Sequence, residues 1–364
     1  MKGLARCGVY FLLMLPLLSI SQESTRDNTP KFSNEFLNIG VGAQSFGLGN
    51  SMVSHVGDVT AAYWNPAGLS NMESDYELAL MHSDFFAGIA NYDYGAFGAR
   101  LNEKSNVALS VIRFAVDNIP DTRFLFDANG AVDYERVRFF SAIDNAFLLT
   151  YATELDVLDG LSVGGSAKII HRIAGNFAKS WGYGIDLGAQ KALGKWQVGL
   201  MAKDILGTFN TWSHNPEEVR DIYNLTGNEI PTNSIEITLP RLILGGSRRF
   251  QFLKVFSLLT TLDWDITFDG KRNTVVRTEL FSVDPHGGVE LGFKELAFLR
   301  FGVNNIQEQL NFDRSTFWSY QPNIGLGIAI KEIHIDYALT DIGDQSDALF
   351  SHVFSLKIDF NVED

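Results

Sequence analysis

The segment Phe350–Phe360, with the sequence FSHVFSLKIDF, decides the fold class. Large apolar side chains share one parity, at Phe350, Phe354, Leu356, Ile358 and Phe360. Polar and charged side chains share the other, at Ser351, Ser355, Lys357 and Asp359. Successive side chains of a β-strand point to opposite faces, so period two over eleven residues predicts a strand with one apolar and one polar face.

The same alternation recurs in the segments that precede this strand. It is clear in residues 183–190, 196–203, 323–331 and 332–340, where one face is apolar and the other is polar or Gly. The predicted strands run about 9 to 12 residues, the length at which a tilted strand crosses the hydrocarbon layer of a membrane. A secreted β-sandwich or propeller is the alternative, but its strands are shorter and the chain has no blade-length repeat.

Connections between the predicted strands alternate in length. The short ones are Asn102–Lys104, Glu154–Gly160, Ala192–Gly194, Gln251–Leu253, Lys294–Leu296 and Lys331–Glu332. The long ones are Val116–Ser141, Ile205–Pro240, Thr267–Pro285, Ile306–Tyr320 and Asp341–Leu349. Outer-membrane barrels place short turns in the periplasm and long loops outside. This alternation is the strongest internal indication of such a barrel.

Enforcing the alternation from a periplasmic C-terminus gives the number of strands. Thr274–Val283 then belongs to an external loop, because counting it as a strand would put the long Ile306 loop on the turn side. Fourteen strands remain, beginning near residues 76, 90, 105, 143, 161, 181, 195, 241, 254, 286, 297, 321, 333 and 350. An even number returns the chain to the periplasm. We therefore predict an all-β fold, a transmembrane antiparallel β-barrel of about 14 strands over residues 76–360, with a periplasmic tail at 361–364.

The first 21 residues predict export. Lys2 and Arg6 precede the apolar run Val9–Leu18, and Ser19-Ile20-Ser21 supplies the small residues of a cleavage site, so residues 1–21 form a signal peptide. The lone Cys7 leaves with it. A mature chain without Cys excludes thiol catalysis and zinc-thiolate sites.

Composition excludes two further classes. Acidic residues outnumber basic ones 43 to 29, so no nucleic-acid partner is expected, because phosphate binding needs clustered cations. A mean hydropathy of +0.02 is far too low for a bundle of membrane helices. The 28 Phe and 33 Gly residues instead fit a barrel, with Phe on the lipid-facing parity and Gly on the inward parity.

Residues 22–75, which precede the first predicted strand, differ from the predicted barrel in composition and pattern. Their part Asn34–Leu69 is rich in Gly and small residues and lacks period-two alternation. Asp58 is expected to cap a short helix over Val59–Trp64, and Pro66 to end it. A fourteen-stranded barrel otherwise encloses a wide lumen. We therefore expect this segment to enter the lumen and plug it.

Three motifs in this segment resemble the N-terminal signature of a known family. They are Phe36–Ala43 (FLNIGVGA), Leu48-Gly49-Asn50, and Asp58–Leu69 with the ending AAYWNPAGL. They cover about a tenth of the chain and resemble the PorV/PorQ family of the type IX secretion system, a branch of the FadL-like fourteen-stranded barrels. Gln44-Ser45-Phe46 and Asn50 depart from that family's commoner residues. The motif residues are Gly40, Gly42, Gly49, Asp58, Trp64, Asn65, Pro66 and Gly68.

The resemblance implies a non-enzymatic outer-membrane component that binds or shuttles secreted cargo through its C-terminal signal domain. The implied partners are secreted proteins with C-terminal sorting domains, the translocon barrel or attachment-complex proteins, and outer-membrane lipid. The alternative is a FadL-type channel for hydrophobic small molecules, with the N-terminal segment as a movable hatch. No nucleophile-base pair and no metal-protease spacing is visible, so neither an enzyme nor a cofactor is expected.

Two of the predicted external loops carry candidate sites. The Val116–Ser141 loop holds a surplus of apolar side chains, which marks either a partner site or internal packing and the bilayer-interface belt. Its candidate partner-binding residues, together with one from the Ile205–Pro240 loop, are Phe124, Leu125, Phe126, Tyr134, Phe139, Phe140 and Trp212. In another loop, Asp341, Asp344 and Asp347 form either a calcium site or, as favoured, a solvated acidic loop.

Overall fold

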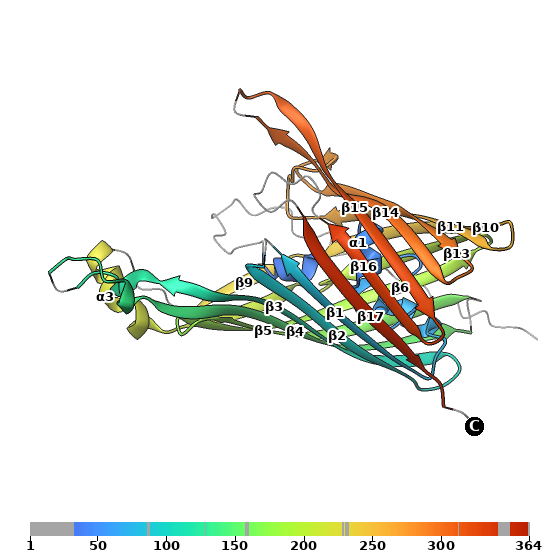
Figure 1. Ribbon diagram of the computed structural model, residues 1–364, viewed down its shortest axis with the longest axis horizontal. Coiled ribbons are helices and arrows are strands. Elements are labelled where there is room, and N and C mark those ends of the chain that lie inside the picture. Colours follow the sequence, from blue (N-terminus) through green and yellow to red (C-terminus); the bar gives the residue numbers. More distant parts are fainter. Residues whose placement is uncertain are drawn as a thin grey trace, which may run out of the picture.

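A computed structural model describes residues 33–362 except 86–87, 128, 157–159, 228, 230–232, 312 and 341–349. Its seventeen-stranded sheet consists of a closed antiparallel ring of fourteen strands and three short strands outside that ring (Figure 1). The ring closes where Tyr76 of the first strand pairs with Phe360 of the last. The predicted fold class is therefore confirmed.

The ring strands follow one another in chain order. They are β1 (Tyr76–Phe85), β2 (Ala90–Arg100), β3 (Ser105–Asp121), β4 (Arg138–Leu155), β5 (Leu161–Ala174), β6 (Ala178–Leu193), β7 (Trp196–Lys203), β10 (Arg241–Phe252), β11 (Phe256–Thr267), β13 (Ser282–Phe293), β14 (Ala297–Leu310), β15 (Thr316–Ile330), β16 (Ile333–Thr340) and β17 (Ser351–Phe360). We call the end of the barrel at Tyr76 and Phe360 the turn end, because the connections there are short. The opposite end is the loop end.

Two predicted loops are shorter in the structure than in the sequence analysis. Within Val116–Ser141, β3 continues to Asp121 and β4 already begins at Arg138. Within Ile306–Tyr320, β14 runs to Leu310 and β15 begins at Thr316. Beyond the hydrophobic band both faces of a strand meet water, so the apolar alternation ends while the hydrogen-bonded ladder continues. Register shifts at Val116/Ile119 and Asn304/Gln307 mark the change.

The apolar parity faces outward around the ring. In β17, Phe354 is 54% exposed and Phe360 is 44% exposed, whereas Ser351 is buried. Large exposed apolar side chains occupy the same outward parity in the other ring strands, for example Leu109, Ile185 and Ile328. This exterior suits contact with lipid. Among the described residues, no helix has the length and apolar character needed to cross a membrane.

An arm extends the barrel wall at the loop end (Figure 1). It consists of the ends of β3 to β6 together with β8 (Thr208–His214), β9 (Ser234–Thr238) and α3 (Pro216–Thr226). The loop between β3 and β4 holds η3 (Thr122–Phe124) and η4 (Tyr134–Arg136). The predicted external loop Thr274–Val283 contains only β12 (Val276–Arg277) and the start of β13.

The described residues before β1 lie inside the barrel; we call residues 33–72 the inner segment. It contains η1 (Glu35–Asn38), α1 (Ala43–Gly47), α2 (Ala61–Trp64) and η2 (Pro66–Asn71). Inward-facing glycines make room for it. A Cβ on Gly199 would lie 2.1 Å from the Val53 carbonyl oxygen, and a Cβ on Gly302 would lie 2.1 Å from the Gly49 nitrogen. That the inner segment closes the lumen to solutes stays a prediction.

Candidate functional site

Side chains of the barrel wall bind the backbone of the inner segment. The Val53 amide donates to Asp263 Oδ2 at 2.9 Å, and the Val59 amide donates to Glu77 Oε2 at 2.8 Å. Gln190 Nε2 donates to the carbonyls of Val53 and Val56 at 3.0 and 3.1 Å. The inward polar parity therefore satisfies the backbone groups that an irregular buried segment leaves unpaired.

The three motif glycines before α2 allow backbone shapes that other residues rarely adopt. Gly40, Gly42 and Gly49 have φ of 114°, 85° and 63°. Gly68 allows a close approach instead, because a Cβ there would lie 2.3 Å from the Val56 carbonyl oxygen. These four residues set the path of the inner segment.

The remaining motif residues stabilise that path through side-chain hydrogen bonds and through the end of α2. Trp64 Nε1 donates to the Val41 carbonyl at 2.9 Å, and Asn65 Nδ2 donates to the Val53 carbonyl at 2.7 Å. Pro66 begins η2, so α2 ends just before it as predicted. Asp58 does not cap a helix that begins at residue 59: α2 begins at Ala61, and the Asp58 carboxylate accepts from the Thr60 amide instead.

An outer cavity of about 750 Å³ lies on the loop side of the inner segment. Part of its wall is apolar and largely aromatic, with contributions from the inner segment and from the barrel: Phe36, Ile39, Phe46, Tyr63, Trp64, Phe85 and Phe114. Phe46 and Phe85 pack with ring centroids 6.4 Å apart. The inner segment and the barrel thus build this apolar surface together.

The rest of the outer cavity is charged, with four carboxylates, four Lys or Arg side chains and His286 among its described lining residues. Arg172 pairs with Asp144 at 2.9 Å and Arg241 pairs with Asp265 at 3.2 Å. Lys203 differs: it is 7% exposed and its Nζ donates to the Leu37 carbonyl at 2.6 Å. In the described part of the chain no carboxylate lies within ion-pair distance of Lys203 Nζ.

The loop between β11 and β13 supplies another ion pair at the rim of the outer cavity. Arg272, a lining residue, pairs with Asp269. Burial opposes ionisation of Asp269, but its hydrogen bond and charge contact with Arg272 outweigh burial and lower the pKa of that carboxyl group. Both side chains are therefore charged at neutral pH.

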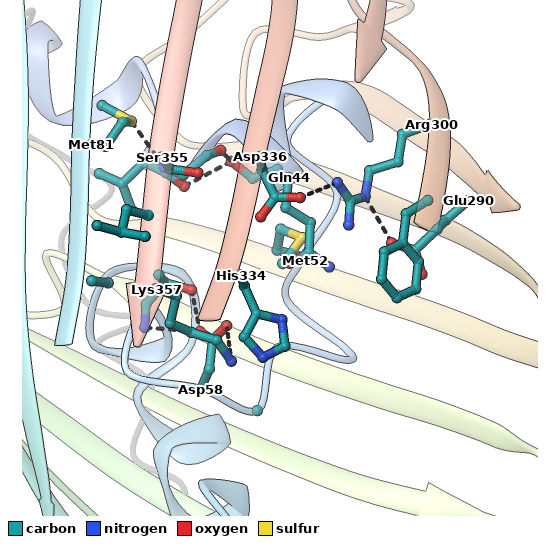
Figure 2. A pocket seen from close by; sticks show the side chains of 18 of the residues that line it. Gln44, Met52, Asp58, Met81, Glu290, Arg300, His334, Asp336, Ser355 and Lys357 are labelled. Atoms are coloured by element: carbon teal, nitrogen blue, oxygen red, sulfur yellow. Dashed lines mark hydrogen bonds and ion pairs between the residues drawn. The ribbon is translucent and has the colours of Figure 1, made fainter. Parts of the chain in front are cut away.

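A second, inner cavity of about 270 Å³ lies between the inner segment and the wall formed by β13 to β17 and β1 (Figure 2). Arg300 Nε contacts Glu290 Oε2 at 2.7 Å, and Arg300 Nη1 contacts Asp336 Oδ1 at 2.5 Å. Nearer the turn end, Lys357 of the wall pairs with Asp58 of the inner segment at 3.6 Å. The inner cavity is lined by apolar side chains such as Leu80 and Ile328 as well as by these charged ones.

A third cavity of about 650 Å³ opens at the turn end. Gly57, His334 and Lys357 line both it and the inner cavity. Its other lining side chains include Glu73, Glu77 and Glu154. We call it the turn-end cavity.

The wall strand beside the outer cavity is interrupted after Lys203. β6 pairs with β7 as far as Leu187 and with β8 from Tyr183 onward, and residues 204–207 bulge between the two strands. Lys168 fills the interior side, with Nζ 2.8 Å from Asp186 Oδ1 and 2.5 Å from Asp204 Oδ1. A buried ion triad thus lies inside the interruption.

The predicted partner-binding residues fall into an exposed group and a half-buried group. Phe126, Tyr134 and Phe139 are 60%, 79% and 64% exposed. Phe124, Leu125, Phe140 and Trp212 are half-buried. Arg138 lies over the Phe124 ring at 4.5 Å, and the rings of Phe140 and Phe177 lie 5.0 Å apart. Phe139 and Phe140 belong to β4 and Trp212 to β8, so their predicted position in loops is wrong, because the strands continue past the membrane band.

The acidic loop residues Asp341, Asp344 and Asp347 lie outside the described residues. Among those described, no group of three or more His, Cys, Asp or Glu side chains is placed to hold a metal ion.

Sequence reasoning did not identify the charged residues of the lumen, such as Lys203, Glu290 and Arg300. Their only signal is a charge on the inward parity of a predicted strand. That signal does not predict which charged side chains contact each other, because their contacts depend on the path of the inner segment through the lumen.

Comparisons with known proteins identify the fold. No family model and no curated protein matches the sequence. Among solved structures, the toluene transporter TodX of Pseudomonas putida matches at 12% identity and TM-score 0.55, over 89% of this chain and 99% of that chain. The toluene transporter TbuX of Ralstonia pickettii matches at 15% identity and TM-score 0.53, over 88% and 99%. CymD, a monoaromatic hydrocarbon channel, matches at 14% identity and TM-score 0.53, over 89% and 98%.

The chain therefore shares its barrel fold with these hydrocarbon transporters and channels. These three solved neighbours are transporters or channels of aromatic hydrocarbons. The finer resemblance, to the PorV/PorQ family, stays a prediction.

Proposed function

We propose that this protein is a FadL-type outer-membrane channel for hydrophobic small molecules and that the outer cavity is its binding site. The turn end then faces the periplasm, and the loop end and the arm face the cell exterior. The observation that carries the proposal is the aromatic wall of the outer cavity, built jointly by the inner segment and by β1 and β3. The barrel fold shared with hydrocarbon channels supports it.

The outer cavity fits weak binding of a small apolar body. A molecule that buries about 150 Å² of apolar surface gains roughly 4 kcal/mol, which corresponds to a millimolar dissociation constant. Weak binding suits a channel, because a tightly held solute does not move on. The paired charges around the aromatic wall keep water in the rest of the cavity and leave the aromatic wall as the place where an apolar solute gains free energy.

Uptake of a radiolabelled monoaromatic hydrocarbon by intact cells tests this function. A deletion strain should take it up more slowly, and the wild-type chain should restore uptake. Phe114→Glu places a charge in the aromatic wall and should restore little. Tyr134→Glu, on the arm outside the cavity, is the matched control and should restore uptake fully. Equal uptake by the deletion and wild-type strains would contradict the proposal.

A protein-binding role in type IX secretion is the second candidate. The observation that favours it is the exposed aromatic group Phe126, Tyr134 and Phe139 on the arm, which has more apolar area than a solvated loop needs. Purification in mild detergent should then recover secreted proteins with C-terminal sorting domains, the translocon barrel or attachment-complex proteins. Normal protein secretion in the deletion strain would argue against this role.

A further inference from the structure

The inner and turn-end cavities adjoin each other, since Gly57, His334 and Lys357 line both. No described residue lines both the inner and the outer cavity. The inner segment separates them at α1, where Gln44 and Ser45 line the inner cavity and Phe46 lines the outer cavity. The lumen is therefore two compartments with α1 as part of the partition.

The two compartments differ in charge. Among the described residues, the inner and turn-end cavities together are lined by eight carboxylates and four Lys or Arg side chains, beside His55 and His334. The outer cavity has four of each. Glu290 of the inner cavity is paired with Arg300, whereas Glu73 and Glu154 of the turn-end cavity have no ion-pair partner among the described residues. An excess of carboxylates inside low-dielectric walls raises the local concentration of cations and lowers that of anions.

Orphan polar atoms indicate that the turn-end cavity holds water. Ser54, which is 2% exposed, and His55 both line it. Ser54 Oγ and His55 Nε2 are buried and have no hydrogen-bond partner among the described residues. Buried polar groups are satisfied by protein or by ordered water, and this cavity is large and polar enough for water.

We propose that the inner and turn-end cavities form a hydrated, cation-selective route through the lower part of the lumen, closed toward the loop end by α1. The route passes water and small inorganic cations and rejects anions when α1 moves away from the wall. This proposal does not depend on the binding of a hydrophobic solute in the outer cavity, so an experiment can contradict one of the two proposals and leave the other standing.

Close contacts hold α1 against the wall. The Ala43 amide donates to Ser355 Oγ at 3.0 Å. Gly47 faces Gly325 of β15 so closely that a Cβ on Gly325 would lie 2.9 Å from the Gly47 Cα. A larger residue at Gly325 must therefore displace α1. Gly246 of β10 is the matched control, because nothing lies within 4 Å of a Cβ there.

Ion permeability of the full-length protein in planar bilayers tests the route. Gly325→Val should raise the conductance in KCl above that of wild type, and the reversal potential in a KCl gradient should give K⁺ over Cl⁻ by about tenfold. Gly246→Val should behave as wild type. Adding Glu73→Gln and Glu154→Gln to Gly325→Val removes two exposed carboxylates of the turn-end cavity and should lower the selectivity about twofold, because exposed charges are partly screened.

Three outcomes would overturn the proposal: a ratio of K⁺ to Cl⁻ permeability at or below one, a ratio unchanged by the two Gln substitutions, or no conductance from a folded Gly325→Val protein. Folding is checked by the heat-dependent shift of barrel mobility on gels. If Gly325→Val does not fold, Ser355→Ala, which removes the hydrogen bond to the Ala43 amide of α1, replaces it in a thallium-flux measurement with vesicles. Flux no faster than through the wild-type chain then counts against the route.

Discussion

The two compartments of the lumen share one wall and differ in chemistry. The outer cavity combines an aromatic surface with equal numbers of carboxylates and Lys or Arg side chains, whereas carboxylates outnumber Lys and Arg in the inner and turn-end cavities. The outward parity of the same strands is apolar nearly all round, because lipid imposes it. Inward positions carry no such constraint, so the inner segment and its contacts set a different chemistry at each end of the lumen.

The partition between the compartments is firmly attached. At least twelve hydrogen bonds join the inner segment to the wall. At about 1 kcal/mol each, they oppose removal of the whole segment by roughly 12 kcal/mol. A hatch that leaves the barrel entirely is therefore unfavourable. A local shift of α1, which has few of these bonds, is the smaller step that would connect the two compartments.

The largest expected effect concerns the charge network of the inner cavity. Arg300→Met leaves Asp336 without a cation and leaves Glu290, which is 1% exposed, with only the exposed Arg249 at 3.3 Å. The free energy of unfolding should fall by about 3 to 5 kcal/mol, since a buried charge loses its partner. Urea unfolding measures this loss. Combining Arg300→Met with Glu290→Gln and Asp336→Asn removes the stranded charges and should recover at least half of it; no recovery would show that packing, not charge, sets the cost.

A slightly smaller effect is expected where the partition meets the wall. In Gly302→Leu the new side chain points at the backbone of Leu48 and Gly49, since a Cβ there lies 2.1 Å from the Gly49 nitrogen. Overpacking against backbone should cost about 3 kcal/mol. Gly246→Leu has open space and should change the same unfolding midpoint little. Equal midpoints for the two variants would mean that the inner segment does not pack against β14.

Sequence patterns predict the wall better than the lumen. The alternation in Phe350–Phe360 predicts β17 because lipid demands apolar side chains at every second position. The sequence pattern did not predict that β4 already includes Phe139 and Phe140. Water lies on both sides of the strand there, so no alternation of apolar and polar side chains is required. The alternation predicts that the side chains of Arg300 and Lys203 face the lumen. It does not predict which residues they contact, because their partners lie on strands and on an inner segment distant in sequence.

Replacing either of the two buried lysines of the wall should lower the free energy of unfolding, and by different amounts. Lys168 pairs with Asp186 and Asp204, whereas Lys203 donates to a backbone carbonyl. Lys203→Met should cost about 1 kcal/mol, because the lost charged hydrogen bond is partly offset by no longer burying an ammonium group. Lys168→Met is the matched control and should cost about 3 kcal/mol, because two carboxylates lose their cation. Equal losses of unfolding free energy would show that Lys203 has a carboxylate partner in solution.

The smallest effect is expected on the arm, outside both compartments. Tyr134 is 79% exposed, so Tyr134→Ala should change the free energy of unfolding by less than about 0.5 kcal/mol. Phe140→Ala, by contrast, removes a ring packed on Phe177 and should cost measurably more. If Tyr134→Ala leaves stability and hydrocarbon uptake unchanged but abolishes recovery of a partner in mild detergent, the arm is a protein-binding surface separate from the channel. If recovery is also unchanged, the exposed aromatic group is not a partner site, and the lumen alone carries the function.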